Sequence, residues 1–237
     1  MKPRGIPLAL GISLLLSGEA LAAGFSCVTP VQSFSNLEKM SAGDFSANVL
    51  WKDVKLTRNS IGYGPGANRQ YELTILDGQV YMARPDKDGE IRVRNDPKPS
   101  EGAAMLQIAS PSVWGLYGEL SEIQSFDDLN FELDMVADDL GCGEDVLLPF
   151  KISGHARSLT WSMDTHPLRV VTSRDQDVVI LGLYNRNQKS KYFMVKGYNL
   201  HPHVVLTGKG WAGHLRDLDL EPGARLYLPA EEGKSSQ

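Results

Sequence analysis

The strongest constraint on the fold is a pattern of alternating apolar and polar residues that is interrupted by turn dipeptides. From Tyr71 to Met82 the residues alternate around Asp77-Gly78, a dipeptide favoured in the tight turn of a β-hairpin. A second such dipeptide, Asp88-Gly89, is followed by renewed alternation from Glu90 to Arg94. Because a period of two is typical of strands with one buried face, the pattern predicts a fold built mainly from strands.

One substantial helix is predicted in the middle of the chain, from Ser125 to Leu140. Ser125 can cap its first turn, where a pair of aspartates complements the helix dipole, and Gly141 or Gly143 can end it. The apolar residues that recur at helical spacing are Phe126, Leu129, Leu133, Val136 and Leu140.

The remaining predicted elements are short. A helix is expected from Ser35 to Gly43, with Ser35 as its cap, and a polar loop from Pro97 to Gly102. Later strands are predicted at Leu147–Ile152, Leu168–Thr172, Val178–Tyr184, Tyr192–Val195 and Leu215–Leu220. The predicted class is therefore α+β and strand-dominated, with mixed or antiparallel sheets in two interlocked halves and one main helix.

The N-terminal residues have the order of a secretory signal peptide. A basic start, Met1 to Arg4, precedes an apolar stretch from Gly5 to Leu16, and Ala20-Leu21-Ala22 is a small-x-small cleavage signal. The apolar stretch is too short to span a bilayer comfortably. We therefore expect residues 1–23 to be removed, leaving residues 24–237 as one exported domain, periplasmic or secreted, with no stable membrane span.

The net charge of −5 and the 22% of charged residues describe a mixed, mildly acidic surface. Such a surface gives nucleic-acid binding no electrostatic support, so no nucleic-acid partner is expected. An anionic substrate would need a local cation to attract it. The two cysteines, Cys27 and Cys142, could pair in an oxidising compartment and tie the N-terminal arm to the middle of the chain, or remain separate thiols.

Three of the five histidines fall within one stretch near the C-terminus. Residues two apart on a strand face the same way, so His201 and His203 can present both imidazoles to one point. Gly208 and Gly210 allow a tight reversal that returns His214 on a neighbouring strand. Three imidazoles without a cysteine suit Zn²⁺ with an open coordination position, as in catalytic zinc sites. The alternative is a chance cluster of surface or core histidines.

The histidines stand in a motif that resembles the zinc-binding segment of acetolactate decarboxylases. The matching stretch is Phe193-Met-Val-Lys-Gly-Tyr-Asn-Leu-His-Pro-His, followed by Ala212-Gly-His-Leu-Arg-Asp-Leu-Asp-Leu. The family has Gly-Tyr-His-Leu-His and then Gly-Gly-His, with the interval that separates His203 from His214. Upstream, Glu72-Leu-Thr-Ile-Leu-Asp-Gly-Gln-Val-Tyr resembles a Gly-Glu-Met-x-x-Leu-Asp-Gly-x-x-Tyr hairpin of the family. The similarity covers most of the chain beyond the signal peptide.

The resemblance implies a carboxy-lyase that converts acetolactate, a small 2-hydroxy-3-oxo acid, to acetoin and carbon dioxide. The implied cofactor is Zn²⁺ held by His201, His203 and His214, which would stabilise the enediolate formed as carbon dioxide departs. Glu72 matches the family's metal-site carboxylate and is the expected proton relay. The expected partner is a small molecule, no organic cofactor is required, and a homodimer is compatible with the pattern.

The sequence departs from the family pattern within the histidine motif. By the Gly-Tyr lead-in, the family's first histidine falls at Asn199, so the pair here is shifted by two residues, and Pro202 separates its members. Were Asn199 the aligned position, His203 would be a bystander.

Two further departures concern charged residues. Ser162 stands where the family has an arginine, and Arg157 is the candidate catalytic replacement if the strand register points it into the site. The family's longer C-terminal tail returns a second glutamate to the metal. Here Glu231 and Glu232 are the only late acidic candidates, and they lie close to the end of the chain.

Three functions therefore compete. The first is the decarboxylase, and the second is an exported zinc-binding protein on the same scaffold without turnover. The third is a metal-dependent hydrolase in which Glu72 acts as the base, although the sequence has no helical His-Glu-x-x-His arrangement. The missing arginine and tail make the residues favour zinc binding more strongly than turnover.

Overall fold

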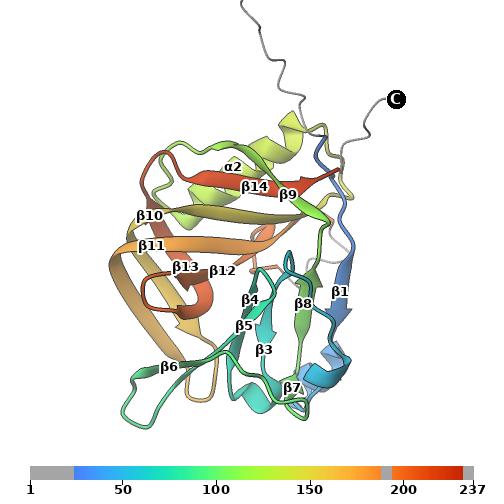
Figure 1. Ribbon diagram of the computed structural model, residues 1–237, viewed down its shortest axis with the longest axis vertical. Helices are drawn as coiled ribbons and strands as arrows, with labels where there is room; N and C mark the ends of the chain where they lie inside the picture. The colour runs from blue at the N-terminus through green and yellow to red at the C-terminus, as the bar shows by residue number, and fades with distance from the viewer. Residues whose placement is uncertain (1–23, 188–193, 232–237) are drawn as a thin grey trace, which may run out of the picture.

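Figure 1 shows the computed structural model, which describes residues 24–187 and 194–231. Within these residues two six-stranded sheets lie against each other. The first, in the order β1-β8-β3-β4-β5-β6, consists of β1 (Val31–Phe34), β3 (Ile61–Pro65), β4 (Glu72–Leu76), β5 (Gln79–Pro85), β6 (Ile91–Arg94) and β8 (Leu106–Ala109). The second, in the order β11-β12-β13-β10-β14-β9, consists of β9 (Val113–Glu119), β10 (Leu147–Met163), β11 (Arg169–Asn185), β12 (Leu200–Leu206), β13 (Trp211–Leu220) and β14 (Arg225–Ala230).

The smaller elements complete the two sheets. The long helix packs against the second sheet, and its apolar face belongs to the same core as β10 and β11. These elements are α1 (Leu37–Ser41), α2 (Phe126–Asp139), the strand pair β2 (Val49–Leu50) and β7 (Gly102–Ala103), and the 3₁₀ turns Trp51–Asp53 and Ala67–Arg69.

The sheets confirm the predicted strand-dominated α+β class. All pairings between these named strands are antiparallel. In the second sheet β10 pairs with β11 as well as with β13, and β12 joins β11 to β13, so these strands close on themselves. Strands β3, β4 and β5 of the first sheet pack against β11, β12 and β13 of the second. Side chains from both sheets therefore meet along one interface.

The predicted hairpin is present as β4 and β5. Asp77 and Gly78 both have positive φ, +50° and +78°, as a two-residue hairpin turn requires. Leu76 pairs with Gln79 across this turn. A Cβ at Gly78 would lie 2.4 Å from the carbonyl oxygen of Thr57, so this position has no room for another residue. The turn fixes the register that places the first residue of β4 in the sheet interface.

The central helix also forms as predicted. The side chain of Ser125 accepts a hydrogen bond of 3.1 Å from the backbone N–H of Asp128, which caps the first turn of α2. Gly141 follows the last turn with φ +69°, the left-handed conformation that commonly ends a helix. Its buried residues are Phe126, Leu129, Leu133, Val136 and Ala137.

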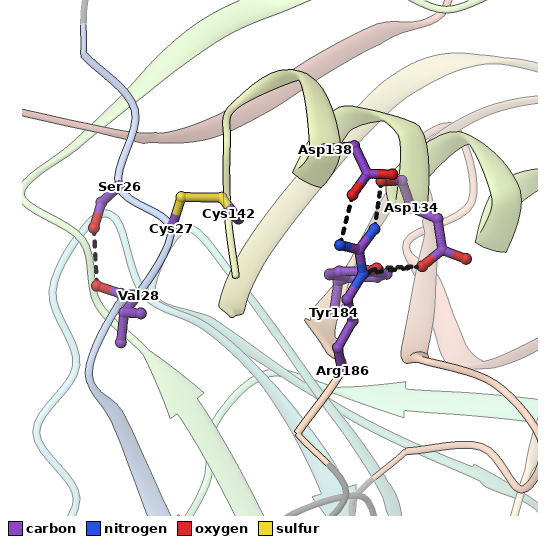
Figure 2. Close-up of a disulfide and its surroundings, with 8 residues drawn as sticks. All are labelled: Ser26, Cys27, Val28, Asp134, Asp138, Cys142, Tyr184 and Arg186. Atoms are coloured by element: carbon purple, nitrogen blue, oxygen red, sulfur yellow. Dashed lines mark hydrogen bonds and ion pairs between the residues drawn. A yellow bond between two sulfur atoms is a disulfide. The ribbon is translucent and has the colours of Figure 1, made fainter. Parts of the chain in front are cut away.

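The two cysteines form a disulfide that ties the N-terminal arm to the end of α2 (Figure 2). Cys142 lies just after the C-cap of the helix, and Cys27 lies in the arm before β1. The backbone N–H of Leu147 donates to the carbonyl oxygen of Cys27, so the arm also runs along the start of β10. The sequence was compatible with either a disulfide or two separate thiols, and the structure contains the disulfide.

Beside the disulfide, Figure 2 shows Arg186 lying against the acidic side of α2. Its guanidinium donates to Oδ1 of Asp138 at 2.7 Å and to the carbonyl oxygen of Asp134 at 2.7 Å. The hydroxyl of Tyr184 donates to the Asp134 carboxylate and accepts from Arg186. We call the disulfide and these four residues the helix anchor, because together they hold α2 to the arm and to the end of β11.

Some predicted boundaries are wrong. The two strands predicted at Leu168–Thr172 and Val178–Tyr184 are parts of one continuous strand, β11, which begins one residue later, at Arg169, and Leu147–Ile152 is only the start of β10. The polar residues between the two predicted strands are largely exposed, and the backbone stays extended through them. Of the predicted strand Tyr192–Val195, the first two residues lie outside the described residues and the last two are not in a strand.

The N-terminal region differs in smaller ways. Asn36, not Ser35, caps α1, since its side-chain oxygen accepts from the backbone N–H of Lys39 at 2.9 Å. The predicted signal peptide, residues 1–23, lies outside the described residues. Among the residues that are described, neither α-helix is long and apolar enough to cross a membrane.

Candidate metal centre

Three histidines on neighbouring strands converge where the two sheets meet. His201 and His203 lie on β12, and His214 lies on β13 opposite His203 in the antiparallel register. The turn between these strands contains Gly210 at φ +63°, which glycine adopts without steric cost. One ligand nitrogen from each histidine lies within 4.8 Å of the others. The structure thus brings together the three rings that the sequence predicts to converge, and they are arranged so that they can hold a metal ion.

Two of these histidines use one ring nitrogen for a polar contact, while the other nitrogen has no partner in the described part of the chain. Nδ1 of His203 lies 2.8 Å from Oγ1 of Thr74 on β4, and Nδ1 of His214 lies 3.3 Å from Oδ2 of Asp164. The Nε2 atoms of both rings are buried and have no hydrogen-bond partner among the described residues. Metal-binding histidines have this pattern, because an outer partner on one nitrogen fixes the tautomer whose other nitrogen offers its lone pair. The orphaned nitrogens therefore fit a bound metal.

A buried aromatic ring holds the imidazoles in place. Tyr63 on β3 is fully buried and stacks on His201, with ring centroids 4.3 Å apart, and on His203 at 5.1 Å. The rings of His201 and His214 stack on each other at 4.5 Å. Because a rotation of any of these rings would break packing contacts, the three nitrogens are preorganised around one point.

Burial favours the neutral form of the histidines. It lowers the pKa of His203 well below the usual value, and the neighbouring His214 and His201 lower this pKa further. Burial also lowers the pKa of His214, although the hydrogen bond with Asp164 opposes the shift. Neutral imidazole is the form that binds a metal ion, so the site is ready for a cation without losing protons first.

A buried carboxylate lies beside the histidines. Glu72 is the first residue of β4 and is 3% exposed. Its Oε1 lies 3.5 Å from Nε2 of His203, and its Oε2 accepts a hydrogen bond of 2.9 Å from the backbone N–H of Asp164. Burial raises the pKa of Glu72 well above the usual value, and the charge of Asp164 raises it further. Glu72 thus lies where the sequence places it, next to the orphaned nitrogens.

The second carboxylate at the site, Asp164, was missed in the sequence analysis. It directly follows β10, and Arg216 from β13 binds its two oxygens at 2.7 and 2.5 Å. Ser162 donates to Oδ1 at 2.7 Å and accepts from Nε of Arg216 at 2.9 Å. Burial raises the pKa of Asp164, but hydrogen bonds from His214 and Ser162 outweigh it and hold this pKa well below the usual range. Asp164 is therefore an anion that orients His214.

A small cavity opens onto the histidines and has a volume of about 190 Å³. One wall depends on Gly64, where φ is +152° and a Cβ would lie 2.2 Å from the carbonyl oxygen of Met105. The cavity combines apolar and charged lining residues, as expected of a site for a small polar molecule. Its lining residues are Phe45, Gly64, Pro65, Arg69, Glu72, Met105, Asp164, His201 and His214.

Solved structures with the same architecture identify the fold. The model aligns with acetolactate decarboxylase from Bacillus subtilis subspecies spizizenii with a TM-score of 0.66 and 13% identity, over 85% of this chain and 86% of that one. Alpha-acetolactate decarboxylase from Bacillus subtilis strain 168 gives the same values. The fold is that of acetolactate decarboxylase. A protein of unknown function similar to alpha-acetolactate decarboxylase, from Staphylococcus aureus, aligns with a TM-score of 0.64 and 16% identity, over 85% of this chain and 86% of that one.

Sequence comparisons add nothing to this assignment: no family model and no curated protein matches the chain. At such low identities the likeness concerns the acetolactate decarboxylase fold, and the chemistry has to be argued from the residues of this chain. Those residues include the convergent histidines, Glu72 and Asp164.

The strand register does not point Arg157 into the site, which was the condition for its role as a replacement. The guanidinium of Arg157 lies 2.6 Å from Asp219 and 2.6 Å from Glu122, and Arg157 is not among the residues that line the cavity. The pairing of β10 with β13 shifts register between Ala156 and Ser158, so Arg157 sits in a β-bulge. A bulge redirects the side chain of its extra residue, and the guanidinium of Arg157 pairs with Asp219 and Glu122 instead of lining the cavity.

Within this acetolactate decarboxylase fold, two other arginines lie at or beside the cavity. Arg216 reaches Ser162 from the adjacent strand, and Arg69 lines the cavity. Of the late acidic residues, Glu231 lies beside the N-terminal arm, where its backbone N–H donates to Gly24, and Glu232 lies outside the described residues. The second described carboxylate at the histidines is therefore Asp164.

Proposed function

We propose that the protein is an exported, zinc-dependent carboxy-lyase that converts acetolactate to acetoin and carbon dioxide. One observation carries the proposal. Two buried imidazole nitrogens, Nε2 of His203 and of His214, have no hydrogen-bond partner among the described residues and lie together with a nitrogen of His201. A buried, unpartnered polar atom costs roughly 1–3 kcal/mol, and a metal ion would remove that cost at both atoms.

The donor set favours zinc. Three neutral imidazoles provide three ligands and leave a coordination position open for a substrate, as in catalytic zinc sites. When bound, Zn²⁺ would act as a Lewis acid that stabilises negative charge on the substrate oxygens as carbon dioxide leaves. Thr74 and Asp164 would hold the ring tautomers of His203 and His214 by their contacts with Nδ1.

Glu72 is placed to handle the proton that the reaction requires. Loss of carbon dioxide breaks a carbon–carbon bond and leaves its electron pair on the remaining fragment, so one proton must be added to that carbon to give acetoin. Glu72 lines the cavity, and its Oε1 lies 3.5 Å from Nε2 of His203. We assign it the delivery of this proton.

Two observations support the proposed export. The first 23 residues have the order of a signal peptide. The Cys27–Cys142 disulfide adds independent support, because disulfides persist in oxidising compartments such as the periplasm or the extracellular medium.

A direct test supplies racemic acetolactate to the zinc-loaded mature chain and follows acetoin above the spontaneous rate. Variants His203→Ala and His214→Ala should fall to that spontaneous rate. His155→Ala is the matched control, since His155 also contacts a carboxylate, Asp177 at 2.9 Å, but lies on the surface. It should retain the wild-type rate.

The outcomes separate the competing functions. Acetoin formation that depends on His203 and His214 but not on His155 supports the lyase. Zinc binding without acetoin formation would contradict the lyase and leave a zinc-binding protein without this turnover, or one that acts on esters or amides.

A further inference from the structure

One arginine occupies a distinctive place in the cavity. Arg69 lies in the 3₁₀ turn between β3 and β4, and it is the one lysine or arginine among the described residues that line the cavity. The same walls carry two carboxylates, Glu72 and Asp164. Because Asp164 is already paired with Arg216, Arg69 is the cationic side chain among these lining residues that can balance an incoming anion.

The backbone of Arg69 is fixed on both sides. Its N–H donates to the carbonyl oxygen of Gly66 at 3.0 Å, and its own carbonyl oxygen accepts from the backbone N–H of His166 at 3.1 Å. Arg69 and the preceding Asn68 have φ values of +54° and +55°, a left-handed conformation that costs a residue other than glycine roughly 1 kcal/mol. Such strained residues persist where the surrounding structure holds them, and they cluster at binding and catalytic sites.

The side chain of Arg69 is fixed as well, but its outer nitrogens have no hydrogen-bond partner among the described residues. Nε donates to the carbonyl oxygen of Asp164 at 3.0 Å, and the guanidinium carbon lies 5.3 Å from the ring centre of Phe45. No described carboxylate forms an ion pair with Arg69. By contrast, Arg216 is held by both oxygens of Asp164, and Arg157 is held by Asp219 and Glu122. The fork formed by Nη1 and Nη2 of Arg69 is therefore open to a ligand.

We infer that Arg69 binds the carboxylate of the small 2-hydroxy acid that enters the cavity. This inference rests on the proposed function, because it takes acetolactate as that acid. A guanidinium whose outer N–H groups are open matches a carboxylate bidentately, which a lysine cannot do. Arg69 would distinguish an acid from a neutral molecule of the same shape, and it would align the bond to the carboxylate that breaks.

The reaction limits what Arg69 contributes. The carboxylate bound by Arg69 departs as neutral carbon dioxide, so this contact weakens as the reaction proceeds. A group that holds the substrate more strongly than the transition state lowers KM without raising kcat. Loss of the guanidinium should therefore appear mainly in KM.

The experiment measures binding separately from turnover. Zinc-loaded protein is titrated calorimetrically with the acid in which the ketone of acetolactate is reduced to an alcohol, and with the neutral diol that lacks the carboxylate. The variants are Arg69→Gln and Arg69→Lys. The matched control is Arg84→Gln, because Arg84 also lies over an aromatic ring, Tyr71 at 5.2 Å, and is not among the residues that line the cavity. Zinc content and thermal unfolding are recorded for every variant.

Arg69→Gln is expected to weaken binding of the acid by roughly ten- to a hundred-fold, because a charge-assisted hydrogen-bonded pair is lost, while binding of the neutral diol stays within two-fold. Arg69→Lys should fall between wild type and Arg69→Gln, since it keeps the charge but not the fork. If Arg69→Gln does not fold, the acid-to-diol ratio of Arg69→Lys decides. Arg84→Gln should match wild type for both ligands.

Two results would overturn the inference. One is equal weakening of acid and diol binding in the Arg69 variants, and the other is acid binding as tight as in wild type. Its failure is distinct from failure of the proposed function. Wild-type protein that forms no acetoin but binds the acid through Arg69 would contradict the lyase alone. Acetoin formation with unchanged acid binding in Arg69→Gln would contradict the carboxylate contact alone.

Discussion

The helix anchor and the metal centre are both partly buried polar clusters, but they are completed in opposite ways. In the helix anchor the cysteines are bonded to each other, and Arg186 is matched by Asp134, Asp138 and Tyr184. In the metal centre the buried Nε2 atoms of His203 and His214 have no hydrogen-bond partner among the described residues. Because unsatisfied buried polar atoms destabilise a fold, a cluster that keeps them is expected to be completed by a ligand. The comparison thus separates a structural cluster from a functional one.

If the metal centre is the functional cluster, substitutions in it should mainly lower the rate of acetoin formation. Glu72→Gln removes the proton relay and is expected to slow acetoin formation by roughly 10²- to 10⁴-fold, with zinc content unchanged. Glu122→Gln, which changes a surface carboxylate paired with Arg157, should keep the wild-type rate. A Glu72→Gln variant with wild-type turnover would remove Glu72 from the mechanism.

If the helix anchor is structural, substitutions in it should mainly lower the free energy of unfolding. The disulfide closes a loop with a sequence separation of 115 residues. Replacing both cysteines by serine is expected to lower the free energy of unfolding by about 3 kcal/mol, since cross-links of long loops restrict the unfolded chain. Denaturant titration measures this loss. Zinc affinity of the folded variant should stay at the wild-type value. A variant that folds but binds no zinc would contradict the claim that the helix anchor is purely structural.

A subtler change at the metal centre should affect metal affinity. Thr74→Val keeps the shape of the side chain but removes the hydroxyl beside Nδ1 of His203. Outer partners of this kind set ligand orientation, so zinc affinity is expected to fall about ten-fold in a competition titration with a chelator. The control is Thr172→Val, which changes an exposed threonine on β11 and should leave zinc affinity unchanged. Equal zinc affinity in the two variants would contradict the claim that the hydroxyl of Thr74 orients His203 for metal binding.

The smallest expected effect comes from the ion pairs of the helix anchor. Arg186→Met should lower the free energy of unfolding by about 1 kcal/mol, a modest value because the side chain of Asp138 is 61% exposed and solvent screens that pair. Thermal unfolding and zinc content are measured together, and zinc content should not change. Arg92→Met, in an exposed pair with Asp86, should shift stability less. A larger loss for Arg92→Met than for Arg186→Met would contradict this ranking.

The sequence predicted features that depend on local spacing. The hairpin at Asp77-Gly78, the cap at Ser125 and the strand alternation of His201 and His203 each follow from residues close together in the chain. The return of His214 also follows, because only a short glycine-containing turn separates it from His203. Local rules therefore give the strand-dominated class and the three convergent rings.

The rest of the site depends on pairings between distant strands. Asp164 follows one long strand and meets Glu72, which is 92 residues away along the chain, and Arg69 reaches Asp164 over 95 residues. Nothing local to Asp164 indicates these partners. Arg157 illustrates the same limit, because its place in the site was conditional on the strand register, and the register shift appears only in the pairing of β10 with β13.

The most direct test of the account is the zinc content of the purified mature chain after incubation with zinc and dialysis, measured by mass spectrometry. We expect one zinc ion per chain in the wild type and in His155→Ala, and none above background in the double variant His203→Ala, His214→Ala. Wild-type protein without zinc, or a double variant that keeps as much zinc as wild type, would contradict the claim that the buried imidazoles hold the metal.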